Sequence, residues 1–128
     1  MTYSFFGTSY EDIDIFYDCL ISMAKQSVAP NEIIIIDSSK KPINQDIFEK
    51  IFNSKNITII YENIKLPRVE ALNYAISKSN SIYLLRFDTR TRFANNYAEE
   101  ALKLLNKKKT IKLYYWSSWR ETSLLPCK

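Results

Sequence analysis

Four consecutive isoleucines, Ile33–Ile36, form the stretch that most limits how this chain can fold. Because β-branched side chains with no polar interruption suit a strand that is buried on both faces, the run predicts a central strand of a parallel sheet covered by helices. A second, mainly apolar run covers residues 82–87. Each run ends in an aspartate, Asp37 or Asp88, and ligands of open α/β sheets bind beyond the carboxyl ends of the strands. Both carboxylates are therefore candidate site residues.

The remaining apolar positions alternate between strand and helix patterns along the chain. Apolar runs predict strands over 3–6, 32–37, 57–61 and 81–87, and helical spacing predicts helices over 12–26, 43–52, 68–78 and 97–105. In the third helix we expect Val69, Leu72 and Ile76 to face the core. Strict alternation of strands and helices indicates an α/β protein, a three-layer α/β/α fold with a mostly parallel sheet.

The scarce residue types exclude several kinds of chemistry. Gly7 is the sole glycine, which excludes the glycine-rich phosphate loops of dinucleotide-binding and P-loop proteins. The absence of histidine excludes Ser-His-Asp and Cys-His catalysis and histidine metal sites. The two cysteines, Cys19 and Cys127, match no zinc-binding spacing. Cys19 lies on the apolar face of a predicted helix, so we expect a buried, inert thiol.

Size and charge place further bounds on the chain. At 128 residues, 46% apolar and 25% charged, it has the composition of a single globular domain. Its net charge of +4 favours an anionic ligand or an anionic membrane surface without requiring either. We find no signal peptide and no stretch near the roughly 20 apolar residues that span a bilayer, so we expect a cytoplasmic protein. Lysines 107–109 most simply meet solvent at a helix end; a contact with the inner face of the membrane is the alternative, and no nucleic-acid partner is expected.

Three segments carry a pattern beyond their periodicity. Residues 19–39 contain Leu20-Ile21-Ser22, Gln26-Ser27 and a strand ending in Asp37-Ser38-Ser39. They resemble the Leu-x-Ser-Leu…Gln-Thr helix and the Glu-Ile-Ile-Val-Val-Asp-Asp-Gly-Ser strand of family 2 glycosyltransferases, which have the GT-A fold. Residues 63–73 are similar to that family's Asn-x-Gly-x-x-x-Ala-Arg-Asn segment, and 83–88 to the strand leading into its Asp-x-Asp metal motif. The resemblance runs from about residue 3 to about residue 105, in the family's order and spacing.

The resemblance implies roles for particular residues. Thr8 would lie on the nucleotide side of the first turn, and Asp37 would accept a hydrogen bond from the uracil or ribose of a nucleotide-sugar. Arg68 would border the diphosphate, where a guanidinium binds two oxygens at once. Asp88 would be the first carboxylate of the metal motif, holding Mg²⁺ or Mn²⁺ against the pyrophosphate and stabilising the charge on the departing diphosphate.

The chain departs from the family pattern immediately after Asp88. Thr89-Arg90 stands where the family usually has a second aspartate, so that a carboxylate is replaced by a cation. Arg86, Arg90 and Arg92 surround Asp88 in the sequence. Two interpretations stay open: the arginines simply neutralise Asp88, or Arg90 or Arg92 substitutes for part of the metal's charge at a diphosphate. In the second case Arg90 joins the nucleotide-sugar-binding residues.

The length of the chain limits what the resemblance implies. We expect residues 1–109 to form the nucleotide-sugar-binding half of a GT-A domain, truncated before the acceptor half, with no residue identified as catalytic base. Residues 110–128 would form an aromatic tail. Its segment 114–119 is either an added edge strand or an exposed apolar surface that favours self-association, and we favour the exposed surface.

Two classes of function follow. The first is a glycosyltransferase-like protein that binds UDP-sugar or a similar nucleotide-diphospho-sugar and transfers the sugar to a glycan or lipid acceptor in surface polysaccharide synthesis. The second is a non-catalytic α/β remnant or partner subunit that binds a nucleotide weakly or binds only protein. A flavodoxin-like or receiver-type domain shares the alternation, but a receiver would need an acidic pair near the first strand and a late lysine.

Overall fold

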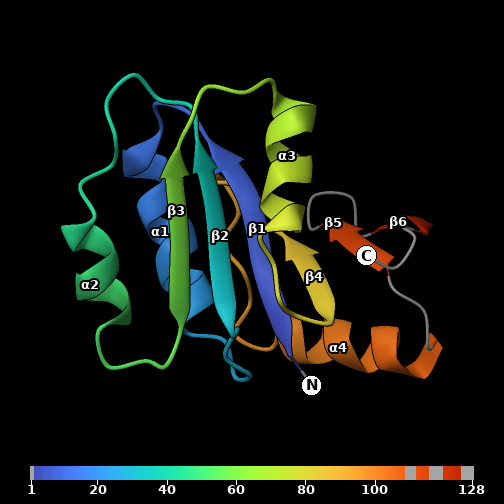
Figure 1. The fold of residues 1–128 in the computed structure, drawn as a ribbon. Helices are drawn as coiled ribbons and strands as arrows, with labels where there is room; N and C mark the ends of the chain where they lie inside the picture. Colours follow the sequence, from blue (N-terminus) through green and yellow to red (C-terminus); the bar gives the residue numbers. More distant parts are fainter. Residues whose placement is uncertain (1, 109–111, 116–119, 125–128) are drawn as a thin grey trace.

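The computed structural model describes residues 2–108, 112–115 and 120–124, which are built around one sheet (Figure 1). Within these residues the strand order is β3-β2-β1-β4-β5-β6. The strands are β1 (Tyr3–Ser9), β2 (Glu32–Asp37), β3 (Thr58–Asn63), β4 (Tyr83–Arg86), β5 (Lys112–Tyr115) and β6 (Arg120–Leu124). Strands β1 to β5 run parallel, and β6 pairs with β5 in the antiparallel sense. The predicted, mostly parallel sheet is confirmed.

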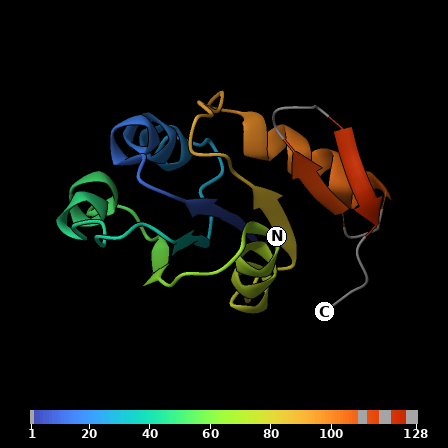
Figure 2. The same cartoon turned by 90° about the horizontal axis from the view of Figure 1, so that it is seen from above.

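Helices cover both faces of this sheet. They are α1 (Ile13–Ala24), α2 (Asp46–Phe52), α3 (Arg68–Ser77) and α4 (Tyr97–Lys108). Helices α1 and α2 lie on one side and α3 on the other, as the view from above shows (Figure 2). The apolar side chains of α4 join the same core as those of α1 and α2. The fold is therefore the predicted three-layer α/β/α arrangement.

The isoleucine run forms the centre of the structure. All four side chains of Ile33–Ile36 are at most 1% exposed, and β2 pairs with β1 on one side and β3 on the other. Ile33 and Ile35 join the core under α1, α2 and α4, whereas Ile34 and Ile36 join the core under α3. Because successive strand residues point to opposite faces, a strand between two helical layers needs apolar residues at every position.

The strand order reverses beside β1. The chain passes from β1 to β2 and β3 at one side of the sheet, and α3 then returns it to β4 on the other side of β1. The connecting segments therefore lead in opposite directions from the carboxyl ends of β1 and β4. Open α/β sheets hold their ligands at such a point. The first residues of α3 lie at this same end of the sheet, at the top of Figure 1.

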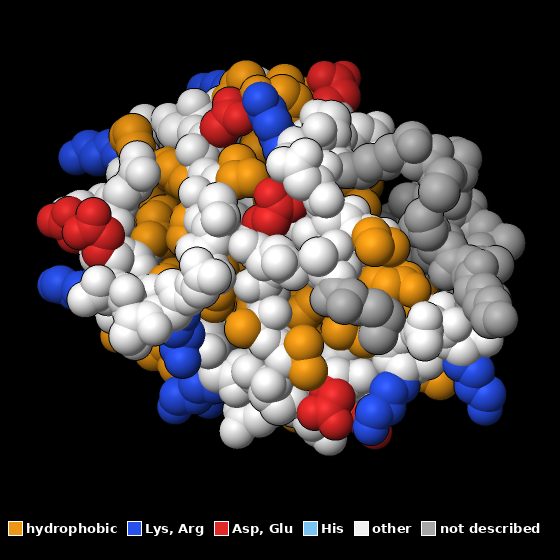
Figure 3. Space-filling model, turned by 60° about the horizontal axis from the view of Figure 1, so that its bottom comes forward, with side chains coloured by type: hydrophobic (Ala, Val, Ile, Leu, Met, Phe, Trp, Pro, Cys, Tyr) orange, Lys and Arg blue, Asp and Glu red, His pale blue; other side chains and the backbone are white. Residues whose placement is uncertain are grey.

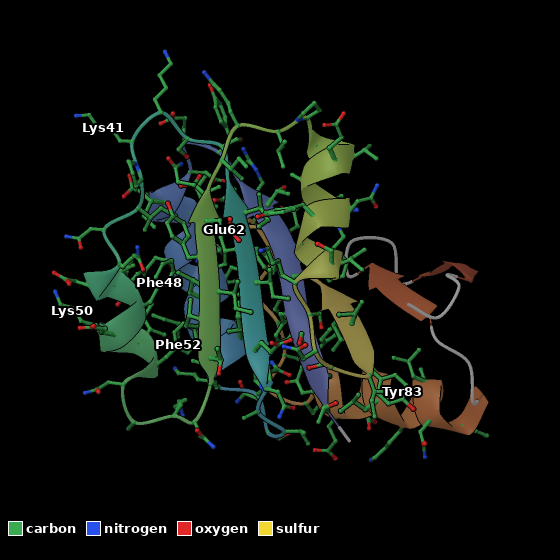
Figure 4. All side chains as sticks on the ribbon, viewed as in Figure 1. Lys41, Phe48, Lys50, Phe52, Glu62 and Tyr83 are labelled. Carbon is green, nitrogen blue, oxygen red and sulfur yellow. The ribbon has the colours of Figure 1, made fainter. Side chains whose placement is uncertain are left out.

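Helix α2 is shorter than the sequence pattern predicts. It begins at Asp46 rather than at Ile43, because Asn44 Oδ1 accepts a hydrogen bond from the Asp46 N–H at 3.0 Å and turns the chain just before the helix. The Ile43 N–H donates instead to the Tyr61 hydroxyl at 2.7 Å, which holds this residue in the loop. Phe48 points from α2 toward the sheet and joins its core, as expected of an apolar residue in the helix predicted over 43–52 (Figure 4).

The prediction that Val69 faces the core is wrong. Its side chain is 69% exposed, whereas Ala71 and Ala75 are buried against the sheet. Leu72 and Ile76 lie beside this small-residue stripe and are partly buried. The sheet-facing side of α3 is centred on alanines, whose small side chains let the helix lie close to the strands. A prediction based on the large apolar residues of α3 therefore assigns the wrong side of the helix to the core.

The chain after α4 continues the sheet. Residues Lys112–Tyr115 form β5 next to β4, so the described part of the segment 114–119 belongs to a strand, and the exposed apolar surface that we favoured for this segment stays a prediction. Residues 116–119 and Cys127 lie outside the described part of the chain. Among the described residues, no helix has the length and apolar character needed to cross a bilayer.

Gly7 is required by the close approach of β1 to Phe87. A Cβ at this position would lie 2.7 Å from the Phe87 carbonyl oxygen and 2.8 Å from its ring, and both atoms are fixed in the core. We expect Gly7→Ala to destabilise the protein by about 1–3 kcal/mol through overpacking. Urea unfolding measures this, with the exposed Ser54→Ala as control. An unchanged midpoint for Gly7→Ala would show that Phe87 moves away at no cost.

Candidate functional site

A cavity of about 310 Å³ opens where the strand order reverses. It lies at the carboxyl ends of β1 and β4 and is closed on one side by the first turn of α3. The side chains and backbone around it come from residues 8–10 and 12, Ser38, Leu66, Arg68, Ala71 and residues 86–90. Polar and charged groups predominate, which suits a hydrophilic ligand.

Four of the residues implied by the resemblance line this cavity. Thr8 comes from the end of β1, Arg68 opens α3, and Asp88 and Arg90 lie in the loop that follows β4. Thr8 is half-buried, and the other three side chains are exposed to solvent. The fold thus brings together residues that are up to 82 positions apart in the sequence.

Asp37 does not line the cavity. Its side chain is 0% exposed, and its carboxylate accepts hydrogen bonds from neighbouring side chains. The donors are the hydroxyls of Ser9 (3.0 Å), Ser39 (2.6 Å) and Tyr61 (2.6 Å), the Ser39 N–H (3.1 Å) and Asn63 Nδ2 (3.5 Å). These groups join the carboxyl ends of β1, β2 and β3, so Asp37 holds the strand ends together. The nucleotide contact that the resemblance implies for Asp37 stays a prediction.

Asp12 is a cavity residue that the sequence motifs did not indicate. It lies in the loop between β1 and α1, where Oδ2 accepts a hydrogen bond from the Thr89 hydroxyl at 2.5 Å and Oδ1 accepts one from the Tyr10 N–H at 3.2 Å. This contact between Asp12 and Thr89 joins the loops that follow β1 and β4. Only the adjacency of these strands places Asp12 next to Asp88, and no local pattern carries that information.

The loop after β4 is held by one hydrogen bond within the loop and one from α1. Asp88 Oδ1 accepts a hydrogen bond from the Arg90 N–H at 3.0 Å, and the Cys19 thiol donates to the Asp88 carbonyl oxygen at 3.4 Å. Burial, followed by the nearby charges of Asp88 and Asp12, raises the pKa of the Cys19 thiol well above its usual range. The thiol is therefore neutral and unreactive, as the sequence predicts.

Three arginines give the cavity its positive side. Arg86 ends β4, Arg90 follows Asp88, and Arg68 begins α3, whose N-cap residue Pro67 offers no side-chain cap. The first N–H groups of a helix lack intrahelical partners, so the end of α3 adds a partial positive charge. Arg92 lies elsewhere: its guanidinium pairs with Asp18 at 2.6 Å in a solvent-exposed ion pair.

The donor groups around the cavity do not fit a divalent cation held by the protein. Asp12 uses both carboxylate oxygens in hydrogen bonds, and Asp88 uses one. Nowhere in the described part of the chain do three or more Asp, Glu, Cys or His side chains converge as a metal site. Mg²⁺ and Mn²⁺ prefer several oxygen ligands, whereas this cavity holds more arginines than aspartates. The Mg²⁺ or Mn²⁺ ion expected at Asp88 stays a prediction.

Comparison with known proteins identifies the family. Residues 6–118 match the family described as "Glycosyl transferase family 2", and the chain belongs to this family. No curated protein sequence matches the chain.

Solved structures of S. aureus TarS share the fold. TarS residues 1–349 superpose with a TM-score of 0.72 at 19% identity, covering 89% of this chain and 35% of that one. The TarS 1–349 complex with UDP-GlcNAc gives a TM-score of 0.69 at 20% identity, covering 89% and 34%. A longer TarS structure gives 0.70 at 20% identity, covering 89% and 21%. This chain thus has the GT-A fold and spans about a fifth to a third of the length of these neighbours.

Removal of the Asp37 charge should destabilise the protein. In Asp37→Asn the amide offers one acceptor oxygen where the carboxylate had two, and it places an N–H group against the donors of Tyr61 or Ser39. We expect a loss of about 1–3 kcal/mol, the usual cost of buried donors left unpaired. Urea unfolding measures it, and the exposed Asp14→Asn serves as the matched control with little effect. Equal midpoints for both variants would contradict the structural role of Asp37.

The contact between Tyr61 and Asp37 should also make stability depend on pH. Burial and the hydrogen bond to Asp37 raise the pKa of Tyr61 from 10.0 to about 12. Because the folded pKa lies above the unfolded one, this contribution is complete below pH 10 and is lost as the pH rises toward 12. The difference in unfolding free energy between wild type and Tyr61→Phe should therefore shrink over this range. A constant difference through pH 12 would rule out the raised pKa.

Proposed function

We propose that this chain binds a nucleotide-diphospho-sugar, such as a UDP-sugar, in the cavity at the ends of β1 and β4. The observation that carries the proposal is the convergence of Thr8, Arg68, Asp88 and Arg90 on one cavity at the reversal of strand order. Membership of glycosyl transferase family 2 supports it. The TarS structures with the same fold include complexes with UDP and with UDP-GlcNAc.

The charges of the cavity support a diphosphate position on the side near α3. Arg68 presents up to five N–H donors there, and the free N–H groups at the start of α3 point toward the same end of the sheet. Phosphate groups bind well at such helix ends, and guanidinium groups bind them with two parallel hydrogen bonds. Thr8 and Ser38 at the ends of β1 and β2 then border the nucleoside, and Asp37 keeps these strand ends in place without touching it.

The family supports a further proposal: transfer of the sugar to a glycan or lipid acceptor in surface polysaccharide synthesis, in the cytoplasm or at the inner face of the membrane. On the face seen in Figure 3, lysines and arginines are spread around the rim with acidic side chains among them. Lys41 lies in the loop before α2 and Lys50 lies in α2 itself, and both are exposed (Figure 4). A membrane contact through this face would therefore involve dispersed charges.

Ligand binding should be visible as thermal stabilisation. UDP or UDP-GlcNAc at 100 times its Kd should stabilise the folded state by about 2.7 kcal/mol. We expect Arg68→Ala to abolish most of the shift, because the substitution removes the guanidinium beside α3, while Arg92→Ala outside the cavity keeps it. Differential scanning fluorimetry measures both, with and without MnCl2. No shift with either ligand under either condition would remove the proposal.

The same samples decide between the two classes of function. The alternative, a non-catalytic α/β module or partner subunit, is favoured by one observation: both cavity carboxylates, Asp12 and Asp88, are already engaged in hydrogen bonds. When a glycan or lipid acceptor is added, release of UDP with transfer of GlcNAc to the acceptor hydroxyl indicates a transferase, whereas binding without transfer supports the module.

A further inference from the structure

We propose that the cavity binds the diphosphate group directly through arginine side chains and without a divalent cation. This inference rests on the proposed binding of a nucleotide-diphospho-sugar and specifies which groups neutralise the diphosphate. It separates this chain from the metal-dependent pattern that the Asp-x-Asp motif implies. A divalent cation needs negatively charged ligands around it, and the described residues of the cavity offer too few of them.

The acidic side of the cavity is too weak to hold the cation. Asp88 Oδ1 accepts the Arg90 N–H, and among the described residues the other carboxylate oxygen of Asp88 has no hydrogen-bond donor. Asp12 bonds with both oxygens to Tyr10 and Thr89, and these contacts hold the two loops together. A divalent ion bound through Asp88 alone would have to take nearly all its other ligands from the diphosphate and from water. The protein would then contribute little to the affinity for the ion.

The basic side of the cavity already supplies the missing charge. Arg68, Arg86 and Arg90 line the same space, against the two carboxylates of Asp12 and Asp88. Arg86 already interacts with another group of the protein. Arg68 and Arg90 are both exposed at the cavity, where their guanidinium groups attract a diphosphate and repel a further cation. The three guanidinium groups come from the start of α3, the end of β4 and the loop after β4, and the fold brings them together.

Among the arginines that follow Asp88, the structure assigns the role to Arg90. The hydrogen bond from its N–H to Asp88 Oδ1 fixes the turn, and the residue lines the cavity in the place of the family's second aspartate. Arg92, the other candidate from the sequence, pairs with Asp18 and does not line the cavity. A guanidinium at position 90 therefore presents hydrogen-bond donors and positive charge where the family pattern places a metal-binding carboxylate.

The first test measures UDP binding by isothermal titration calorimetry, once in EDTA and once in MnCl2. We expect the same Kd in both buffers, and inorganic pyrophosphate should compete with UDP in EDTA. Binding that appears only with MnCl2 overturns the cation-free inference and leaves the proposed nucleotide binding standing. Absence of binding in both buffers removes the proposed function itself, so the two failures are distinguishable.

The second test exchanges the charge at position 90. We expect Arg90→Ala to raise the Kd for UDP in EDTA by about 10- to 100-fold, the loss of charge-assisted hydrogen bonds. Arg90→Asp, which restores the spacing of the Asp-x-Asp motif, should lose binding in EDTA and regain part of it with MnCl2. Arg92→Ala is the matched control and should bind as wild type does. Wild-type affinity of Arg90→Asp in EDTA would overturn the role of Arg90.

A third measurement examines the cation without nucleotide. Electron paramagnetic resonance detects free aqueous Mn²⁺, and wild-type protein should leave this signal undiminished, whereas Arg90→Asp should reduce it. Stoichiometric loss of the signal with wild type would overturn the inference. Because the Arg90 side chain is exposed, its variants should keep the unfolding midpoint of the wild type, which circular dichroism verifies.

Discussion

The pairing of β1 with β4 is the contact on which the site depends. It requires Gly7, because the Phe87 carbonyl and ring occupy the space where any Cβ would lie. The Phe87 N–H donates to the Phe6 carbonyl at 2.9 Å, just beyond the last residue of β4. This junction places the loops after β1 and β4 side by side, and the hydrogen bond between Thr89 and Asp12 then joins them. The cavity and its charges are consequences of this one adjacency.

Two aspartates at strand ends have different physical roles. Asp37 is fully buried and accepts hydrogen bonds from three strand ends, so its carboxylate is a structural acceptor. Asp88 is exposed and lines the cavity, with one oxygen engaged by its own loop. The resemblance gave Asp37 a contact with the nucleotide, whereas the geometry gives the cavity to Asp88, Arg68 and Arg90. A strand end determines where a carboxylate lies, but its neighbours determine what it can bind.

The balance of charge gives this chain its individual character within the family. The chain belongs to family 2, and it shares the GT-A fold with the much longer TarS. Arg90 in place of a carboxylate changes the net charge beside Asp88 by two units, and Arg68 lines the same cavity. Electrostatic complementarity to a diphosphate can therefore come from the protein itself. In the proposed cation-free site, Arg90 removes the need for a metal ion beside the diphosphate.

The sequence by itself determined the layers of the fold and several residues of the site. Ile33–Ile36 predicted a strand buried on both faces because neighbouring side chains of a strand point in opposite directions. The end of such a strand indicated Asp88 directly, whereas Thr8 and Arg90 became candidates through the resemblance to family 2 glycosyltransferases. The orientation of α3 was missed at Val69, since its close contact with the sheet uses alanines that carry little hydrophobic signal.

Only the tertiary structure decided what the strand ends do. The burial of Asp37 depends on Tyr61 and Asn63 of β3, and the presence of Asp12 and Arg86 at the cavity depends on the adjacency of β1 and β4. It also separated Arg90 at the cavity from Arg92 in its pair with Asp18. These outcomes depend on strand order and register, which bring distant residues within hydrogen-bonding range. Local periodicity specifies a strand and its faces but carries no information about which strand becomes its neighbour.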